Sequence, residues 1–387
     1  MVPPIESAAA QTLRIDEYAV PGSGPNGIAS GPDGNLWFTD PAQNSIDRFV
    51  GGTVTAYPLP DTNLVPSDIT KGPDGNLWFL EMNNHTNATT LDVGKISTAG
   101  TVTEYPTPAG FTSGIAAGPD GNVWFNERDL FSVAKISPSG VVTSYPVPGP
   151  PASEDPIGIV AGPDGKMWVT DESSNIVWRV TTGGSFTPFN LPTPNRGPAA
   201  MTVGADGNLW FAEGNTNQIG RMTTTGTLTE FAVPTANAGP LGLTKGADGN
   251  VWFTEAGANQ VGFITPAGAI FEYPIPSANS FPRAPALGPD GHIWFPEAIG
   301  KLGRVAGFQR LYESIPPVTV QLATPVVRPT PPPPVHQPPA ATTSATRRQR
   351  TQPASPPALR PLPRDVVVGL ARLANVTSVS LVALFSR

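Results

Sequence analysis

The stretch GPDGNLWFTD, residues Gly31–Asp40, returns six more times along the 387-residue chain. Each copy contains one tryptophan, and successive copies are 41 to 46 residues apart. The seven repeated tryptophans are Trp37, Trp78, Trp124, Trp168, Trp210, Trp252 and Trp294. Seven copies at this period, without the helical signature of other repeats of similar length, predict an all-β fold: a seven-bladed β-propeller with one blade per copy.

Each copy is expected to form four short strands. The first is rich in small residues, as in Gly27–Gly31, and Pro32–Gly34 then forms a tight turn because glycine tolerates a positive φ. The second strand, Leu36–Thr39, is apolar on both faces, as expected where blades stack on both sides. A third strand and an outer strand that ends in prolines, as in Glu272–Pro276, complete the unit. Trp178 lies outside the repeat and is assigned to packing.

Composition supports many strands joined by turns, and it excludes several kinds of chemistry. Only 14% of the residues are charged, and the chain contains 41 glycines and 48 prolines, which interrupt helices. The absence of cysteine excludes disulfides, thiolate catalysis and cysteine-bound zinc. The N-terminal sequence MVPPIESAAAQT lacks the basic start and apolar run of a signal peptide, so a cytoplasmic location is expected.

Charge divides the chain into two parts. Residues 1–315 contain 15 basic and 29 acidic side chains, a net charge of −14, whereas residues 316–387 contain eight arginines and one acid, a net charge of +7. An acidic body argues against nucleic acid as the propeller's partner. We therefore predict a propeller over residues 12–315, acting as a monomer, and a disordered tail rich in proline and arginine over residues 316–387. The terminal apolar run Val366–Phe385 contains Arg372, which disfavours a transmembrane span; a partner-bound or interfacial segment and plain disorder both remain open.

A carboxylate follows each repeated tryptophan by three residues: Asp40, Glu81, Glu127, Asp171, Glu213, Glu255 and Glu297. Seven acids at one end of the propeller would suit a cation funnel. A feature present in every blade is better explained by the needs of the blade, such as a hydrogen bond to backbone at the end of the second strand. Function is therefore sought where the repeat is broken.

The loops that enter the blades vary in sequence, and they lie at the same end of the propeller as these acids. We call this end the variable pole. Its candidate ligand-binding residues are Arg283, Glu297 and Arg128. No two of the three histidines, His85, His292 and His336, share a motif, so each is interpreted as a surface residue. The chain also lacks a phosphate-binding glycine loop and the GxSxG and HExxH motifs.

Several phrases in the blades resemble the streptogramin B lyases, also called virginiamycin B lyases: NTNQIGRMT, TEFAVPT and GANQVGFIT, which begin at Asn215, Thr229 and Gly257. The resemblance extends over about residues 12–315 and implies a seven-bladed propeller. It also implies a magnesium-dependent carbon–oxygen lyase, which opens a cyclic depsipeptide antibiotic by elimination at its ester and so confers antibiotic resistance.

The residues that this resemblance would make functional are replaced. Leu241 stands where the family has a catalytic histidine, Phe281 and Arg283 stand where it has a Glu-Pro-His phrase, and Ala298 stands at a second metal-linked glutamate, with Glu297 one residue earlier. Elimination needs a base and an acid. Leucine provides neither, and arginine stays protonated.

Blade four contains a partial echo of the family's metal site. Asp155 precedes a proline as the family's first glutamate does, and Glu172 occupies the register of the second, but no histidine accompanies them. Two carboxylates can hold a magnesium ion together with waters, while coincidence in an acidic insertion is the alternative. No cofactor is certain from the sequence, and magnesium is the one candidate.

The sequence thus favours a propeller that binds a small-molecule or peptide-like ligand, or a partner, at the variable pole without ring opening. A magnesium-dependent lyase with relocated catalytic groups is the alternative, and an extracytoplasmic scaffold would need an export signal. For closure of the ring, eight outer-strand phrases serve seven blades. We predict that Ile15–Val20, rather than the strand around Tyr312, pairs outside the blade of Trp294, because early closure removes an exposed edge.

Overall fold

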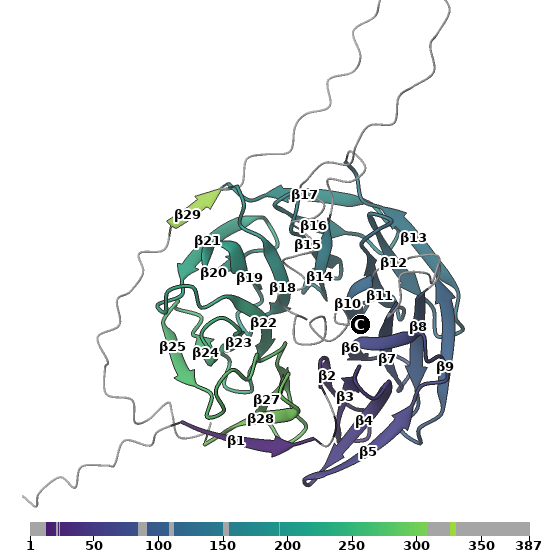
Figure 1. The fold of residues 1–387 in the computed structure, drawn as a ribbon. Coiled ribbons are helices and arrows are strands. Elements are labelled where there is room, and N and C mark those ends of the chain that lie inside the picture. The colour runs from purple at the N-terminus through teal and green to yellow at the C-terminus, as the bar shows by residue number, and fades with distance from the viewer. Residues whose placement is uncertain are drawn as a thin grey trace, which may run out of the picture. The chain divides into compact units, whose positions relative to one another are not determined.

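The computed structural model describes residues 13–307, apart from 21, 23, 84–90, 108–111, 150–154 and 193, together with a strand over residues 326–329. Seven antiparallel sheets surround a central axis, which confirms the predicted seven-bladed propeller (Figure 1). The described residues contain no α-helix, and their one helical turn is the 3-10 turn η1, Gly214–Thr216. All described elements lie in one compact unit, Met1–Pro334. The predicted domain boundary at residue 315 stays a prediction.

In each of the first four blades, four consecutive strands run from the axis outward (Figure 1). Blade one consists of β2 (Ile28–Ser30), β3 (Leu36–Asp40), β4 (Ser45–Val50) and β5 (Thr53–Pro58), and blade two of β6 (Leu64–Lys71), β7 (Leu77–Asn83), β8 (Leu91–Ile96) and β9 (Val102–Thr107). Blade three consists of β10 (Thr112–Ala117), β11 (Val123–Glu127), β12 (Ser132–Ile136) and β13 (Val142–Pro146), and blade four of β14 (Pro156–Ala161), β15 (Met167–Asp171), β16 (Ile176–Val180) and β17 (Phe186–Asn190).

The last three blades depart from this plan in two places, namely the outer edges of blades five and seven. Blade five consists of β18 (Pro198–Val203), β19 (Leu209–Glu213), β20 (Gln218–Met222), β21 (Thr227–Ala232) and β29 (Val326–Pro329). Blade six consists of β22 (Pro240–Lys245), β23 (Val251–Glu255), β24 (Gln260–Ile264) and β25 (Ile270–Pro274), and blade seven of β26 (Ala286–Leu287), β27 (Ile293–Glu297), β28 (Lys301–Ala306) and β1 (Arg14–Ala19).

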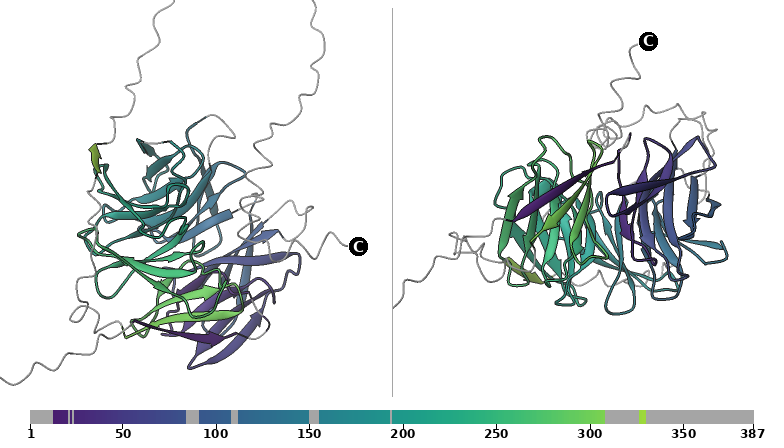
Figure 2. Two further views of the ribbon diagram at one scale, coloured as in Figure 1. Left: turned by 60° about the vertical axis from the view of Figure 1, so that its left-hand side comes forward. Right: turned by 90° about the horizontal axis from the view of Figure 1, so that it is seen from below.

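The N-terminal strand closes the ring, as predicted. Strand β1 pairs antiparallel with β28, from Arg14 opposite Ala306 to Ala19 opposite Lys301, and lies along the outside of blade seven (Figures 1 and 2). The amide of Val20 extends the pairing by donating to the Gly300 carbonyl over 2.9 Å. The edge of β28 is therefore covered. Tyr312, the alternative, lies outside the described residues.

The C-terminal tail contributes a strand that the sequence analysis did not predict. Strand β29 pairs antiparallel with β21, from Val326 opposite Glu230 to Pro329 opposite Thr227. This finding corrects the prediction of a wholly disordered tail at residues 326–329. A four-residue ladder flanked by prolines is possible at an edge because its outward side needs no partner. The rest of the tail, Val366–Phe385 included, lies outside the described residues.

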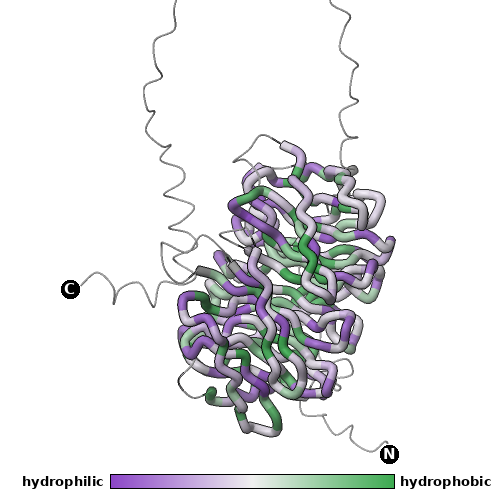
Figure 3. Tube along the Cα trace, turned by 90° about the vertical axis from the view of Figure 1, so that its right-hand side faces the viewer, coloured by the Kyte–Doolittle hydropathy of each residue, from purple (hydrophilic) through white to green (hydrophobic). Residues whose placement is uncertain are grey.

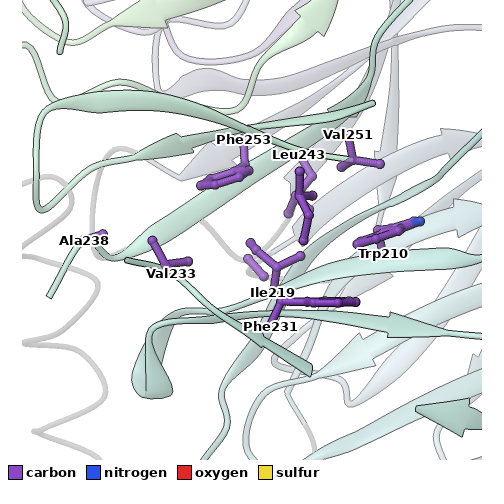
Figure 4. Close-up of a cluster of buried hydrophobic side chains, with 10 residues drawn as sticks. Trp210, Ile219, Phe231, Val233, Ala238, Leu243, Val251 and Phe253 are labelled. Carbon is purple, nitrogen blue, oxygen red and sulfur yellow. The ribbon is translucent and has the colours of Figure 1, made fainter. Parts of the chain in front are cut away.

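The repeated tryptophans fill the interfaces between neighbouring blades. Trp37 and five others are at most 1% exposed and Trp294 is 4% exposed. Figure 4 shows one such interface, in which Trp210 and Ile219 of blade five meet Leu243 and Phe253 of blade six. Hydrophobic residues accordingly follow the strands in Figure 3. Trp178 is also buried, at 4% exposure in the same core cluster as Trp124, which confirms its packing role.

The Gly-Pro-Asp-Gly turn reverses the chain and also holds the indole ring of the tryptophan in place. Gly34 has φ +75°, which confirms the predicted left-handed turn residue. Asp33 accepts a 3.0 Å hydrogen bond from the indole Nε1 of Trp37. Blades two, three, four, five and seven repeat this bond at 2.9–3.1 Å. Because a buried indole N–H needs an acceptor, the turn aspartate recurs with the tryptophan.

Candidate functional site

Two residues at or just before the first strand of each blade lie around the axis at the variable pole. Of these fourteen residues only Asp68 and Arg283 are charged; the others are Asn26, Gly27, Ser67, Ser113, Gly114, Ile157, Gly158, Ala199, Ala200, Leu241, Gly242 and Ala284. Some of them serve the ring itself. Asn26 Nδ2 donates to the Ser67 carbonyl over 2.9 Å, and Ser113 Oγ donates to the Pro156 carbonyl over 2.8 Å. These bonds tie neighbouring blades together, so those side chains are committed to structure.

Asp68 is a site residue that the sequence analysis missed. It stands where the other blades have glycine or alanine, and that break in the repeat is the signal that could have revealed it. Its Oδ1 accepts a 2.9 Å hydrogen bond from the Ile69 amide, and its carboxylate also accepts a backbone hydrogen bond from Ile115 of blade three. Burial raises the pKa of Asp68 to about 6, so the carboxylate would gain from a polar or cationic ligand group at the axis.

Arg283 enters blade seven through an irregular loop. Its amide donates to the Pro296 carbonyl over 2.8 Å, and the neighbouring Pro282 forms an isolated bridge with Glu297. Phe281 has φ +49° and is 43% exposed, so the residue in place of the family's glutamate presents a ring, not an oxygen ligand, to solvent. Burial lowers the pKa of Arg283. A guanidinium at this position can donate hydrogen bonds to a carboxylate or carbonyl group of a ligand.

The seven acids that end the second strands are all fully buried, so they do not form a solvent-facing funnel. The two aspartates accept hydrogen bonds from backbone, as predicted. Asp40 Oδ1 accepts from the amides of Ala42 and Gln43 at 3.1 and 3.2 Å. Asp171 Oδ1 accepts from the amides of Asp155 and Ser174 at 2.9 and 3.1 Å. These carboxylates hold the loops of their own blade.

The five glutamates behave differently, because their longer side chains meet the outer part of the blade. Burial first and the neighbouring Glu272 second raise the pKa of Glu255 to about 8. The pKa of Glu297 rises to about 7 through burial first and Glu17 second. Burial, helped by Glu104, Asp92 and Asp61, raises the pKa of Glu81 to about 9. Among the described residues, no backbone amide bonds to the carboxylates of Glu81, Glu127, Glu255 and Glu297, and the hydrogen-bond partner of Glu213 is the Thr216 hydroxyl. The predicted backbone bond is therefore wrong for this group.

Arg196 is a buried charged residue near this pole that the sequence analysis did not single out. It is 7% exposed, and its guanidinium lies 3.4 Å from Glu213 Oε2 and 2.8 Å from Glu230 Oε1. It bridges a second-strand acid and an outer-strand acid within the protein. Since both acids are buried, Arg196 is assigned to charge compensation.

The predicted residues of blades three and four do come together. Arg128 Nε and Nη2 each donate over 2.6 Å to the two oxygens of Asp155, a bidentate ion pair that links the two blades. The Glu172 amide donates to the Asp155 carbonyl over 3.0 Å. A magnesium ion bound by Asp155 and Glu172 would have to compete with the Arg128 guanidinium. This metal site stays a prediction.

His292 is the only histidine among the residues that the structure describes. This residue lies in the turn at the opposite end of blade seven, with Nδ1 3.3 Å from Asp290 Oδ2. His85 and His336 lie outside the described residues. No three acidic or histidine side chains among residues 13–307, gaps excepted, are arranged to hold a metal ion. The same part of the chain has no helix long and apolar enough to cross a membrane.

The magnesium that the resemblance implies does not fit the family's positions in this chain. Phe281 and Ala298 supply no oxygen ligand from their side chains, and Glu297 is fully buried beside Glu17. Magnesium needs several oxygen ligands at short, nearly octahedral distances. Blades six and seven therefore offer no magnesium site at the family's positions.

Comparison with solved structures supports both the fold and the family. A streptogramin B lyase is 34% identical, with a TM-score of 0.70 over 77% of this chain and 99% of its own. Virginiamycin B lyase from Staphylococcus aureus is 35% identical, with a TM-score of 0.69 over 76% of this chain and 99% of its own. A catalytically inactive histidine-to-alanine variant of that enzyme, in a structure with quinupristin, matches at 34% identity and a TM-score of 0.69 over 76% of this chain and 99% of its own.

Sequence comparison leads to the same family. No curated protein matches the chain. The sequence profile of the Virginiamycin B lyase family matches residues 9–154 and 133–316, two overlapping ranges that span all seven repeats. The chain belongs to the virginiamycin B lyase family.

Proposed function

We propose that this propeller binds a peptide-like ligand at its variable pole and releases it chemically unchanged. The proposed absence of ring opening rests on the missing histidines. The family's two histidine positions hold Leu241 and Arg283, and the only histidine of the described residues, His292, lies at the opposite end. A missing general base alone costs on the order of 10²–10⁴-fold in rate.

Ligand binding is supported by the charges at the axis. Asp68 and Arg283 are the two charged residues among otherwise small or neutral ones, and burial disfavours the charged form of both. A ligand with amide or carboxylate groups can form hydrogen bonds with such side chains, which an apolar ligand cannot. This arrangement favours a peptide-like compound.

Quinupristin, a ligand of the Staphylococcus aureus relative, tests the absence of ring opening. Incubated with this protein and magnesium, it is expected to stay cyclic in chromatography, while the Staphylococcus aureus enzyme serves as positive control. A linear product would establish the alternative, a carbon–oxygen lyase with relocated groups. Asp155, Glu172, Arg283 and Glu297 would then be the first residues to replace.

A thermal-shift panel of cyclic and linear peptides tests binding independently of turnover. Any peptide that raises the melting temperature of the wild type should lose this effect in Arg283→Met, which keeps a long side chain and removes the charge. Lys245→Met, at an exposed position where β22 ends, is the control. Equal shifts in all three proteins would place the ligand elsewhere and refute binding at this pole.

A further inference from the structure

Four positions of a blade meet beside the end of its second strand, and we call them the corner box. They are the second-strand acid, the outer-strand residue that faces it, the third-strand residue three positions before the side chain that covers the tryptophan, and the third residue after the preceding blade's outer strand. In blade seven these are Glu297, Glu17, Lys301 and Ser277. Lys301 Nζ lies 2.9 Å from Glu17 Oε2 and donates to Ser277 Oγ over 2.6 Å. This box contains its own cation.

In the corner box of blade six, neutral hydrogen-bond donors take the place of a cation. Its members are Glu255, Glu272, Gln260 and Thr235. The amide and hydroxyl of Thr235 donate to the two oxygens of Glu272 over 3.0 and 3.1 Å. In blade seven the amide and hydroxyl of Ser277 likewise donate to the two oxygens of Glu17, both over 2.8 Å. The residue after the outer strand is thus a hydrogen-bond donor to the acid of the next blade.

In blade two every corner-box position is an acid: Glu81, Glu104, Asp92 and Asp61. Asp92 stands where blade seven has Lys301, three residues before the cation that covers the tryptophan. Asp61 keeps the backbone bond to Glu104, but its side chain accepts bonds from Asn63 and offers no hydroxyl. The formal charge of the box is −4 in blade two and −1 in blade seven.

The outer-strand acid shows what this box lacks. Glu81 is fully buried and neither of its oxygens has a hydrogen-bond partner in the described part of the chain, which is also true of Glu255 and Glu297. The Oε1 atom of Glu104 is buried without a partner there as well, whereas both oxygens of Glu17 and of Glu272 accept hydrogen bonds. The charges of Glu104, Asp92 and Asp61 all raise the pKa of Glu81, so the unpartnered carboxylate lies near the other three acids. A buried carboxylate without a hydrogen bond is costly unless something compensates it.

We propose that the corner box of blade two binds one divalent hard cation, of the calcium class, in the place that Lys301 Nζ takes in blade seven. The four side chains offer only carboxylate oxygens, which are the ligands that calcium prefers, and calcium tolerates irregular geometry. The described residues hold no three side chains already closed around one point. Asp61 and Asp92 are only partly buried, so they can turn onto the ion.

Isothermal titration of the full chain with calcium chloride tests this proposal. The wild type is expected to bind one ion and to melt at a higher temperature in its presence. Asp92→Lys, which copies Lys301, should abolish calcium binding and raise the melting temperature without calcium. Asp61→Ser, which copies Ser277, should weaken calcium binding at least tenfold. It also serves as the test should Asp92→Lys not fold.

Two controls separate this site from the others. Glu255→Gln changes the box of blade six, and Glu172→Gln changes the candidate metal site at the variable pole; both should bind calcium as the wild type does. The proposal fails if titration of the wild type with millimolar calcium chloride gives no heat of binding. It also fails if Asp61→Ser and folded Asp92→Lys bind calcium as tightly as the wild type, or if Glu172→Gln alone abolishes binding.

Discussion

Side-chain length decides what the repeated acid does at the end of each second strand. Asp40 and Asp171 carry one methylene and accept hydrogen bonds from nearby amides. The glutamates carry two, and Glu255 and Glu297 meet Glu272 and Glu17 of their outer strands. In blades six and seven the longer side chain thus makes the same repeat position a buried member of an acidic pair instead of a loop anchor.

The acidic pair of blade six predicts a stability change with pH. The pKa of Glu255 is raised to about 8, so the folded state holds a proton that the unfolded chain releases near pH 4.3. Stability from this group is complete below the unfolded pKa and is lost as pH rises through about 8. Glu255→Gln mimics the protonated acid. It should match the wild type at pH 4 and melt several degrees higher, roughly 2–4 °C for each kcal/mol gained, at pH 9.

The matched control for this experiment is Glu272→Gln. The Glu272 carboxylate accepts two hydrogen bonds from Thr235, so its loss should lower the melting temperature at pH 6, where Glu255→Gln gains. Melting curves from pH 4 to 9 measure both variants. If Glu255→Gln follows the wild type at every pH, Glu255 is not held protonated in the folded protein.

At the scale of the elements, the N-terminal strand β1 closes the ring by completing blade seven. Leu13 and Ile15 are each 9% exposed and pack in the cluster of Trp252 and Phe295, while Tyr18 lies 5.2 Å from Trp294 between ring centroids. Glu17 in addition reaches Ser277 of blade six. The strand thus contributes core residues and an inter-blade bond besides its backbone ladder.

Deleting residues 1–20 should therefore lower the melting temperature by about 5 °C or more, since it exposes buried apolar surface and the edge of β28. Calorimetry of the truncated and full-length chains gives the comparison. Truncation after Ile315, which removes β29 but no strand of the ring, is the control and should cost clearly less. An unchanged melting temperature after the N-terminal deletion would mean that another segment closes blade seven.

At the scale of the whole molecule, the repeat supports the ring and its interruptions carry the individual properties. The bidentate pair of Arg128 and Asp155, the bridge of Arg196, and the charges of Asp68 and Arg283 all occur where a blade departs from the common sequence. Blades that differ only in such positions can gain or lose a site while their packing stays the same.

Restoring the family's residues tests whether the variable pole is an emptied active site. The quadruple variant Leu241→His, Phe281→Glu, Arg283→His and Ala298→Glu should open quinupristin in the presence of magnesium, while the parent chain leaves it cyclic. Chromatography detects the linear product. Leu241→His alone is the control and should stay silent, because groups of one catalytic unit act together. A folded but inactive quadruple variant would indicate that the pocket has also lost its shape.

The sequence by itself determined the number of blades, their four-strand plan, the tryptophan interfaces and the ring closure by Ile15–Val20. It could do so because each blade is a local unit whose pattern repeats within about forty residues, and because an unpaired edge must be covered. The partners of the charged side chains were decided by the tertiary structure alone. Lys301 meets Glu17, and β29 meets β21, across 284 and about 100 residues of chain, and no local pattern encodes such pairs. The glutamates, Arg196 and the acidic box of blade two acquire their roles only when the blades stack and exclude water.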